Sequence, residues 1–223
     1  SVNTVVISLG GSIIVPEEID TGFLGRFKEI ILSIETARFV IICGGGKTCR
    51  RYQRAAKEIS SISSADLDWI GIGATRLNAE LVRSLFGQKA HERVIHDPYE
   101  RMDGDKRIII GAGFEPGSST DLRAVQVAER FGADQVINMS NIDYVYSEDP
   151  RKNPDAVKLK NISWADFRRL VGNEWDPGLN TPFDPIASRR AEALALTVVI
   201  IGNEIDNLER LLKGDPFTGT TIC

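Results

Sequence analysis

Three short stretches of this 223-residue sequence combine glycine with hydroxyl or cationic side chains. They are SLGGS at residues 8–12, CGGGKTCR at 43–50 and PGSSTD at 116–121. Glycine lets backbone N–H groups approach a ligand closely, and a helix that begins there presents unpaired N–H groups with a partial positive charge. Lys47 and Arg50 add full charges to the second stretch. These features predict a site for phosphate groups, and three such stretches favour more than one phosphate.

Predicted strands run into all three stretches and give them a common location. Apolar runs rich in β-branched residues occupy positions 4–9, 38–43 and 107–113, and helical periodicity follows each of them. Such alternation predicts an α/β fold with a mostly parallel sheet that is covered on both faces. Ligands of open α/β sheets bind beyond the carboxyl ends of the strands. A lone Gly-Gly is also typical of a tight turn, so the prediction rests on the three stretches together.

Further elements complete this pattern. One helix is expected to carry Ile19, Phe23, Phe27, Ile30 and Ile34 on one face. Other helices are expected from about residue 47 and over 74–87, 121–132, 163–171 and 184–195, with strands at 135–139, 197–201 and 219–222. Irregular stretches at 140–161 and 172–183 are long enough to be functional.

Composition narrows the class of protein. The length suits one large domain or two small ones, and the net charge of −4 argues against general nucleic-acid binding. The odd count of cysteines (Cys43, Cys49 and Cys223) indicates free thiols in a reducing compartment. The sequence has no C-x-x-C pair, and its two histidines, His91 and His96, are an unlikely metal pair, so we expect no zinc site and name no metal ligand. No apolar run has membrane-spanning length and no signal-like segment opens the chain, so a cytoplasmic protein is expected.

The order of several motifs carries a family resemblance. SLGGS, CGGGKTCR, DLDWIGIGATRLNA, PGSSTD, SNIDYVYSEDP, FDP and the terminal GTTI follow one another from about Val5 to Ile222. In this order they resemble the amino acid kinase superfamily and, within it, the archaeal-type UMP kinases. The resemblance implies a three-layer αβα sandwich, a single domain over residues 1–223, and a homohexamer built as a trimer of dimers. It also implies Mg²⁺-dependent transfer of the ATP γ-phosphoryl group to UMP, with no membrane or nucleic-acid partner.

The resemblance also implies two sets of site residues. On the ATP side these are Ser8, Leu9, Gly10, Gly11, Ser12, Gly46, Arg50, Ser140, Asn141, Tyr146 and Asp149. On the UMP side they are Gly45, Asp68 at the ribose, and Phe114, Glu115, Pro116, Gly117, Ser118, Ser119 and Thr120 around the uracil and phosphate.

Several of these residues also fit an ordinary structural role. A carboxylate at Asp68 can accept two hydrogen bonds from a ribose diol, but it could equally be a surface acid beside a helix. Arg76 could reach a phosphate or be a solvated arginine at a helix start, and we assign it to the UMP side with Asp68. Tyr146 could stack on adenine or be structural. Asp149, which precedes a proline, could lie near Mg²⁺ or start a turn. Arg123 is expected to be a surface charge.

The position of Ser8 departs from the family pattern. Many relatives carry a lysine there that touches the transferring phosphoryl group, whereas archaeal-type members do not. The phosphate of UMP is already an anionic nucleophile, so the reaction needs alignment and charge neutralisation rather than a base. Candidates for the missing cation are Arg50, Lys47 and Mg²⁺, and we assign the catalytic roles to Arg50, Lys47 and Asp149.

Two other functions fit parts of the sequence. A kinase of the same superfamily could act on another small carboxylate or phosphate. Isopentenyl phosphate kinases generally need a histidine near the second glycine-rich stretch, and none occurs there. A nucleotide-binding module without catalysis is the other alternative, and Ser8 is the feature that favours it.

Overall fold

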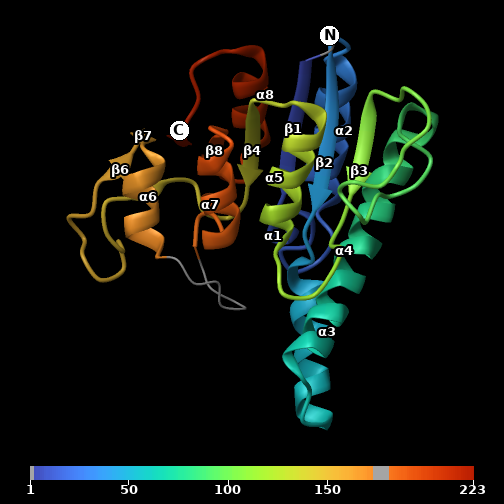
Figure 1. The fold of residues 1–223 in the computed structure, drawn as a ribbon, viewed down its shortest axis with the longest axis horizontal. Coiled ribbons are helices and arrows are strands. Elements are labelled where there is room, and N and C mark those ends of the chain that lie inside the picture. Colours follow the sequence, from blue (N-terminus) through green and yellow to red (C-terminus); the bar gives the residue numbers. More distant parts are fainter. Residues whose placement is uncertain (1–2, 173–180) are drawn as a thin grey trace.

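A computed structural model describes residues 3–172 and 181–223 of the chain. Its centre is a seven-stranded sheet with the strand order β3-β2-β1-β4-β8-β9-β7 (Figure 1). The strands are β3 (Ile108–Gly111), β2 (Ala37–Cys43), β1 (Asn3–Leu9), β4 (Gln135–Met139), β8 (Thr197–Ile201), β9 (Thr220–Ile222) and β7 (Asn161–Ile162). The first five run parallel, and β9 pairs antiparallel with β8. The predicted α/β fold with a mostly parallel sheet is therefore confirmed.

Alternate residues of the central strands enter two separate hydrophobic cores. Ile7 packs in one core with helices α2 (Thr21–Ser33), α4 (Ser64–Phe86) and α8 (Ile205–Lys213). The neighbouring Val6 packs in the other core with α5 (Thr120–Phe131), α6 (Trp164–Val171) and α7 (Pro185–Ala193). Successive strand side chains point to opposite faces of a sheet, so a strand of continuous apolar residues requires a cover on both faces. The result is the three-layer αβα sandwich that the resemblance implied.

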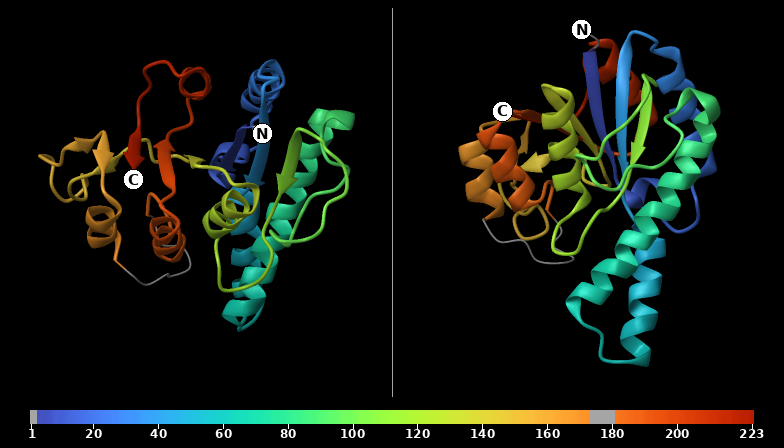
Figure 2. Two further views of the ribbon diagram at one scale, coloured as in Figure 1. Left: turned by 45° about the horizontal axis from the view of Figure 1, so that its top comes forward. Right: turned by 45° about the vertical axis from the view of Figure 1, so that its right-hand side comes forward.

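A helical hairpin extends from the end of this sandwich (Figures 1 and 2). It consists of α3 (Gly46–Ile59) and the first half of α4. Helix α4 begins ten residues before the predicted position 74, because Ser63 caps it by accepting a hydrogen bond from the Asp66 N–H. Residues 64–73 lie beside α3: the Leu67 carbonyl oxygen accepts a hydrogen bond from the Gln53 side chain, and a Cβ atom on Gly71 would lie 3.2 Å from the Cys49 sulfur. The prediction missed this half of the helix.

The remaining elements are short. They are α1 (Gly11–Ile14), the 3₁₀ helix η1 (Gly87–Lys89), and the two-stranded sheet of β5 (Val145–Tyr146) and β6 (Lys158–Leu159). Helix α8 was not predicted; its N-cap is Glu204, which is not a preferred capping residue and makes no side-chain capping bond. Ile19 was wrongly assigned to a buried helix face, since it precedes α2 and is 50% exposed. Among the described residues, no helix is long and apolar enough to cross a membrane.

Candidate active site

The predicted glycine-rich stretches meet at one edge of the sheet. Strands β1, β2 and β3 are parallel neighbours, so their carboxyl ends lie together. The first corner (Gly10 and Gly11) follows β1, and the second corner (residues 44–46) follows β2. The third stretch belongs to the loop between β3 and α5, called here the 112–119 loop (Figure 1). The topology thus brings the three stretches to a common edge, as expected.

The first two corners pack directly on each other. A Cβ atom on Gly11 would lie 1.9 Å from the backbone nitrogen of Gly46. A Cβ atom on Gly44 would lie 2.5 Å from the nitrogen of Gly11, and Gly46 has a φ of +64° that favours glycine. The glycines are therefore already required by contact between the two backbones. The contact places the start of α1 beside the start of α3, so backbone N–H groups of both corners gather in one place.

Buried polar residues of α4 hold this arrangement. The Asn78 side-chain amide donates to the carbonyl oxygens of Gly44 and Gly45, at 2.9 and 3.1 Å. The Thr75 hydroxyl accepts a 2.9 Å hydrogen bond from the Gly113 N–H. Sequence reasoning missed both residues, although they flank Arg76 in the quoted motif GATRLNA. Side chains of one helix thus fix the second corner and the 112–119 loop.

The two candidate cations of the second corner differ in their environment. The Lys47 ammonium lies 3.5 Å from the Glu17 carboxylate, a partner that is largely exposed. Arg50 is exposed and forms no hydrogen bond or ion pair with residues 3–172 or 181–223. Ser8 is buried on β1, aligned with Asn138 of β4. Of these side chains, Arg50 is therefore the most available to a bound phosphate.

Leu9 and Gly10, which were also assigned to the ATP side, contribute backbone atoms rather than side chains to the first corner. The Leu9 side chain is fully buried in the core, and its carbonyl oxygen accepts a 3.0 Å hydrogen bond from the Gly44 N–H. A Cβ atom on Gly10 would lie 2.6 Å from the Met139 carbonyl oxygen and 3.5 Å from the Ser140 Cα. The first corner therefore adjoins Ser140, where the 140–161 stretch begins. Ser12 is half-buried in α1.

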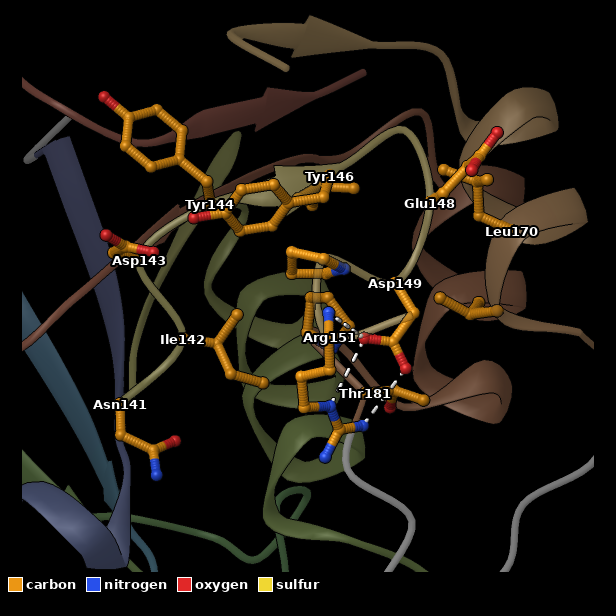
Figure 3. Close-up of a pocket in the computed structure, with 14 residues that line it drawn as sticks. Asn141, Ile142, Asp143, Tyr144, Tyr146, Glu148, Asp149, Arg151, Leu170 and Thr181 are labelled. Carbon is orange, nitrogen blue, oxygen red and sulfur yellow. Dashed lines mark hydrogen bonds and ion pairs between the residues drawn. The ribbon is translucent and has the colours of Figure 1, made fainter. Parts of the chain in front are cut away.

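A pocket of about 540 Å³ lies along the 140–161 stretch. Asn141, Tyr146 and Asp149 line it, together with Leu170 of α6 (Figure 3). Its volume is in the usual range for a small-molecule site. In Figure 3 the Asp149 carboxylate turns toward the Arg151 guanidinium, at distances of 3.2 and 3.3 Å. Hydrogen bonds from Arg151 lower the pKa of the Asp149 carboxyl, and this carboxylate also starts a turn by accepting from the Arg151 N–H.

The 112–119 loop is tied to α4 by two residues that were assigned to the UMP side. One Asp68 oxygen accepts a 2.8 Å hydrogen bond from the N–H of Gly117, whose φ is +87°. The Arg76 guanidinium donates to the carbonyl oxygens of Gly113 and Phe114, at 3.3 and 3.2 Å. Residues 49 positions apart in the sequence thus meet at one place. Asp68 and Arg76 both position the loop, whatever ligand it binds.

Beside this loop lies a pair of carboxylates that sequence reasoning did not select. Asp184 caps α7 by accepting from the backbone N–H groups of Ile186 and Ala187, and it accepts a hydrogen bond from the Ser119 hydroxyl. The Asp121 carboxylate accepts a 3.1 Å hydrogen bond from the Asp184 N–H. Burial, and secondarily the nearby charge of Asp184, raise the pKa of Asp121 to about 7. The two helix starts are therefore joined through an acid that is largely protonated below about pH 7.

The raised pKa of Asp121 predicts a pH-dependent stability. Unfolded aspartate titrates near pH 4, so the folded chain holds the extra proton between about pH 4 and 7, and its stability falls as the pH rises through this window. Asp121→Asn removes the titrating group and keeps an acceptor for the Asp184 N–H. We expect it to raise the free energy of unfolding at pH 8 by up to roughly 4 kcal/mol. Urea unfolding from pH 5 to 8 measures this, and parallel pH profiles of both proteins would contradict it.

A family model and similar relatives both assign nearly the whole chain to one family of proteins. The model of the amino acid kinase family matches residues 3–202. The uridylate kinase of Thermococcus kodakarensis is 38% identical over 223 residues, covering 98% of each chain. That of Methanospirillum hungatei is 34% identical over 224 residues, covering 98% of this chain and 94% of the relative. The crystal structure of uridylate kinase from Archaeoglobus fulgidus superimposes with a TM-score of 0.84 at 33% identity, covering 98% of this chain and 99% of that one.

Proposed function

The chain belongs to the amino acid kinase family, and on that basis we propose that it is a UMP kinase that transfers the γ-phosphoryl group of ATP to UMP. The observation that carries the proposal is the meeting of Asp68 and Arg76 with the 112–119 loop, at the same sheet edge as the paired glycine corners. Full-length similarity to several uridylate kinases supports it. The products would be UDP and ADP, as in pyrimidine nucleotide biosynthesis.

The proposed reaction needs no catalytic base. The phosphate of UMP is itself the nucleophile, so the protein has to align two phosphate-bearing ligands and stabilise negative charge. We propose that N–H groups of the two corners do this, other than those of Gly10 and Gly44, which already donate to the carbonyl oxygens of Met139 and Leu9. Arg50, which has no hydrogen bond or ion pair within the described residues, would supply a cation. ATP would lie from the first corner along the pocket of Asn141 and Tyr146, with UMP against Asp68 and the 112–119 loop.

Mg²⁺ fits this site as an ion that arrives with ATP. The described part of the chain contains no cluster of three or more His, Cys, Asp or Glu residues that could hold a metal. Mg²⁺ in nucleotide sites is commonly held by phosphates and water with one or two carboxylates. Asp149, which lines the pocket, is the carboxylate that we propose for this role. The ion would neutralise charge on the phosphates of ATP.

A coupled assay of ADP release tests the proposed function directly. Acceptors would be UMP, CMP, aspartate, acetylglutamate and isopentenyl phosphate, each with ATP and Mg²⁺. We expect turnover with UMP. Turnover with another acceptor and none with UMP would refute the UMP kinase assignment. Binding of both ATP and UMP without turnover would favour a nucleotide-binding module.

Asp149→Asn is expected to lower kcat about tenfold or more while UMP binding is retained. Asparagine can still accept from the Arg151 N–H and keep the turn, so a loss of rate would report the lost charge. Asp103→Asn is the matched control, because Asp103 is likewise an acid paired with an arginine two positions away but is exposed and does not line the pocket. Steady-state kinetics and UMP titration measure both variants. Normal turnover in Asp149→Asn would remove Asp149 from the site.

We propose a single domain and a homohexamer built from dimers. The seven-stranded sheet, which joins strands from β1 to β9, supports the single domain. Exposed apolar side chains on α3 and α4 support self-association, among them Tyr52, Ile59, Trp69 and Leu77. Sedimentation velocity would give the assembly state. A cytoplasmic location is proposed because ATP and UMP are found there, and the three free thiols are compatible with it.

A further inference from the structure

Arg123 is buried under the 112–119 loop, contrary to its expected surface position. It lies on the first turns of α5 and is 3% exposed. Its guanidinium donates a hydrogen bond to the Ser118 hydroxyl oxygen, and its central carbon lies 5.6 Å from the centre of the Phe114 ring. Both partners belong to the segment that the proposed function places around the acceptor nucleotide.

The guanidinium of Arg123 has few hydrogen-bond partners. Among the described residues, Ser118 is its one hydrogen-bond partner, although arginine has five N–H donors. Burial lowers the pKa of Arg123, and the nearby acids Glu115 and Asp97 oppose that shift without forming a hydrogen bond to it. Arginine nevertheless stays charged. Its remaining N–H donors are not among the buried side-chain atoms that lack a partner, so they keep some access to solvent. The positive charge directly beneath the loop therefore favours an electron-rich group at this surface.

Ser118 lies between the Arg123 guanidinium and the side of the loop that is proposed to face the nucleotide. It is half-buried, whereas Arg123 lies beneath it. A serine hydroxyl has one hydrogen to donate and two lone pairs, and the guanidinium occupies one lone pair. The hydroxyl hydrogen is weakly used, since the Glu115 carbonyl oxygen is 3.5 Å away. Beside a cation, the hydroxyl is therefore a good hydrogen-bond donor and a poor acceptor.

We propose that Arg123 and Ser118 act as a donor pair that selects a base with a carbonyl oxygen, so that the enzyme prefers UMP to CMP. Ser118 would contact the base, and Arg123 would position and polarise Ser118. Uracil presents a carbonyl oxygen at the ring position where cytosine carries an amino group. An amino group is a donor, so it would face the hydroxyl hydrogen and the guanidinium charge. This inference rests on the proposed function, because it assumes that the 112–119 loop holds the base.

Equilibrium binding of UMP and CMP tests the inference. Isothermal titration calorimetry would give the ratio of the two dissociation constants for the wild type, Arg123→Met, Arg123→Lys and Ser118→Ala. We expect the wild type to prefer UMP, and Arg123→Met to reduce that preference about ten- to a hundredfold, the range for a hydrogen bond to a charged group. Ser118→Ala should shift the ratio in the same direction. Arg123→Lys keeps the charge and should restore part of the preference.

Arg130→Met is the matched control. Arg130 lies on the same helix, stacks on the Phe131 ring at 5.1 Å and donates to the Pro98 carbonyl oxygen, away from the loop. Its ratio should equal that of the wild type. Equal loss of UMP and CMP affinity in Arg123→Met, or no UMP preference in the wild type, would overturn the inference. If Arg123→Met does not fold, a wild-type ratio of the UMP and CMP dissociation constants in Ser118→Ala would overturn the inference. A wild type that binds UMP and CMP equally and phosphorylates both at equal rates would refute the proposed selection. The proposed kinase function would still hold in that case.

Discussion

Replacing Gly11 with alanine is expected to destabilise the protein by about 3 kcal/mol or more and to abolish phosphoryl transfer. The added methyl group would lie 1.9 Å from the Gly46 nitrogen and 2.6 Å from the Gly45 nitrogen. These are backbone atoms at the start of α3, so they cannot rotate away as a side chain could. Relief would require the two corners to separate, and the N–H groups that we propose for phosphate binding would then lose their common location.

Gly25→Ala is the matched control for this variant. Gly25 is exposed in the middle of α2, and a Cβ atom there would meet no described atom within 4 Å. Because alanine is the better helix former, this change should add up to about 1 kcal/mol of stability and leave turnover unchanged. Denaturant unfolding and ADP release measure both variants. Wild-type stability and turnover in Gly11→Ala would show that the corners do not touch in solution.

The glycine corners show which features of the site could be predicted from the sequence and which could not. Their position was predictable, because parallel strands place their carboxyl ends at one edge and Gly10, Gly11 and residues 44–46 directly follow β1 and β2. Why these positions are glycine could not be predicted. Glycine was expected to make room for phosphate, whereas the space beside Gly11, Gly44 and Gly46 is filled by the opposite corner. Such a contact joins segments more than thirty residues apart and leaves no local periodicity.

The same limit applies to the candidate site. The order of the motifs identified the 112–119 loop and Asp68 as candidates for the site. The sequence of a helix, however, does not show which segment of the chain packs over it. Arg123 belongs to a helix of ordinary amphipathic pattern, and what buries it is the loop that carries Phe114. Thr75 and Asn78 likewise become functional candidates through partners 38 and 34 positions away. Polar residues that support a site through tertiary hydrogen bonds were therefore the ones missed.

The second large effect is expected for Asp68→Ala, which should raise the KM for UMP on the order of a hundredfold and leave the KM for ATP nearly unchanged. The Asp68 carboxylate would serve two partners at once. One oxygen holds the Gly117 N–H at 2.8 Å, and the other would accept from the ribose of UMP. Loss of the carboxylate would therefore remove a ligand contact and also release the loop that surrounds the base.

Two further measurements separate these contributions. Asp68→Asn keeps an oxygen for the Gly117 N–H but removes the charge, so it should impair UMP less than Asp68→Ala does. Asp66→Ala changes an exposed acid of the same helix two positions away and should leave both KM values unaltered. Equal increases in the KM for ATP and UMP in Asp68→Ala would contradict the assignment. If only UMP is affected and asparagine restores part of the loss, one carboxylate couples ribose binding to the position of the loop, since both depend on the same side chain.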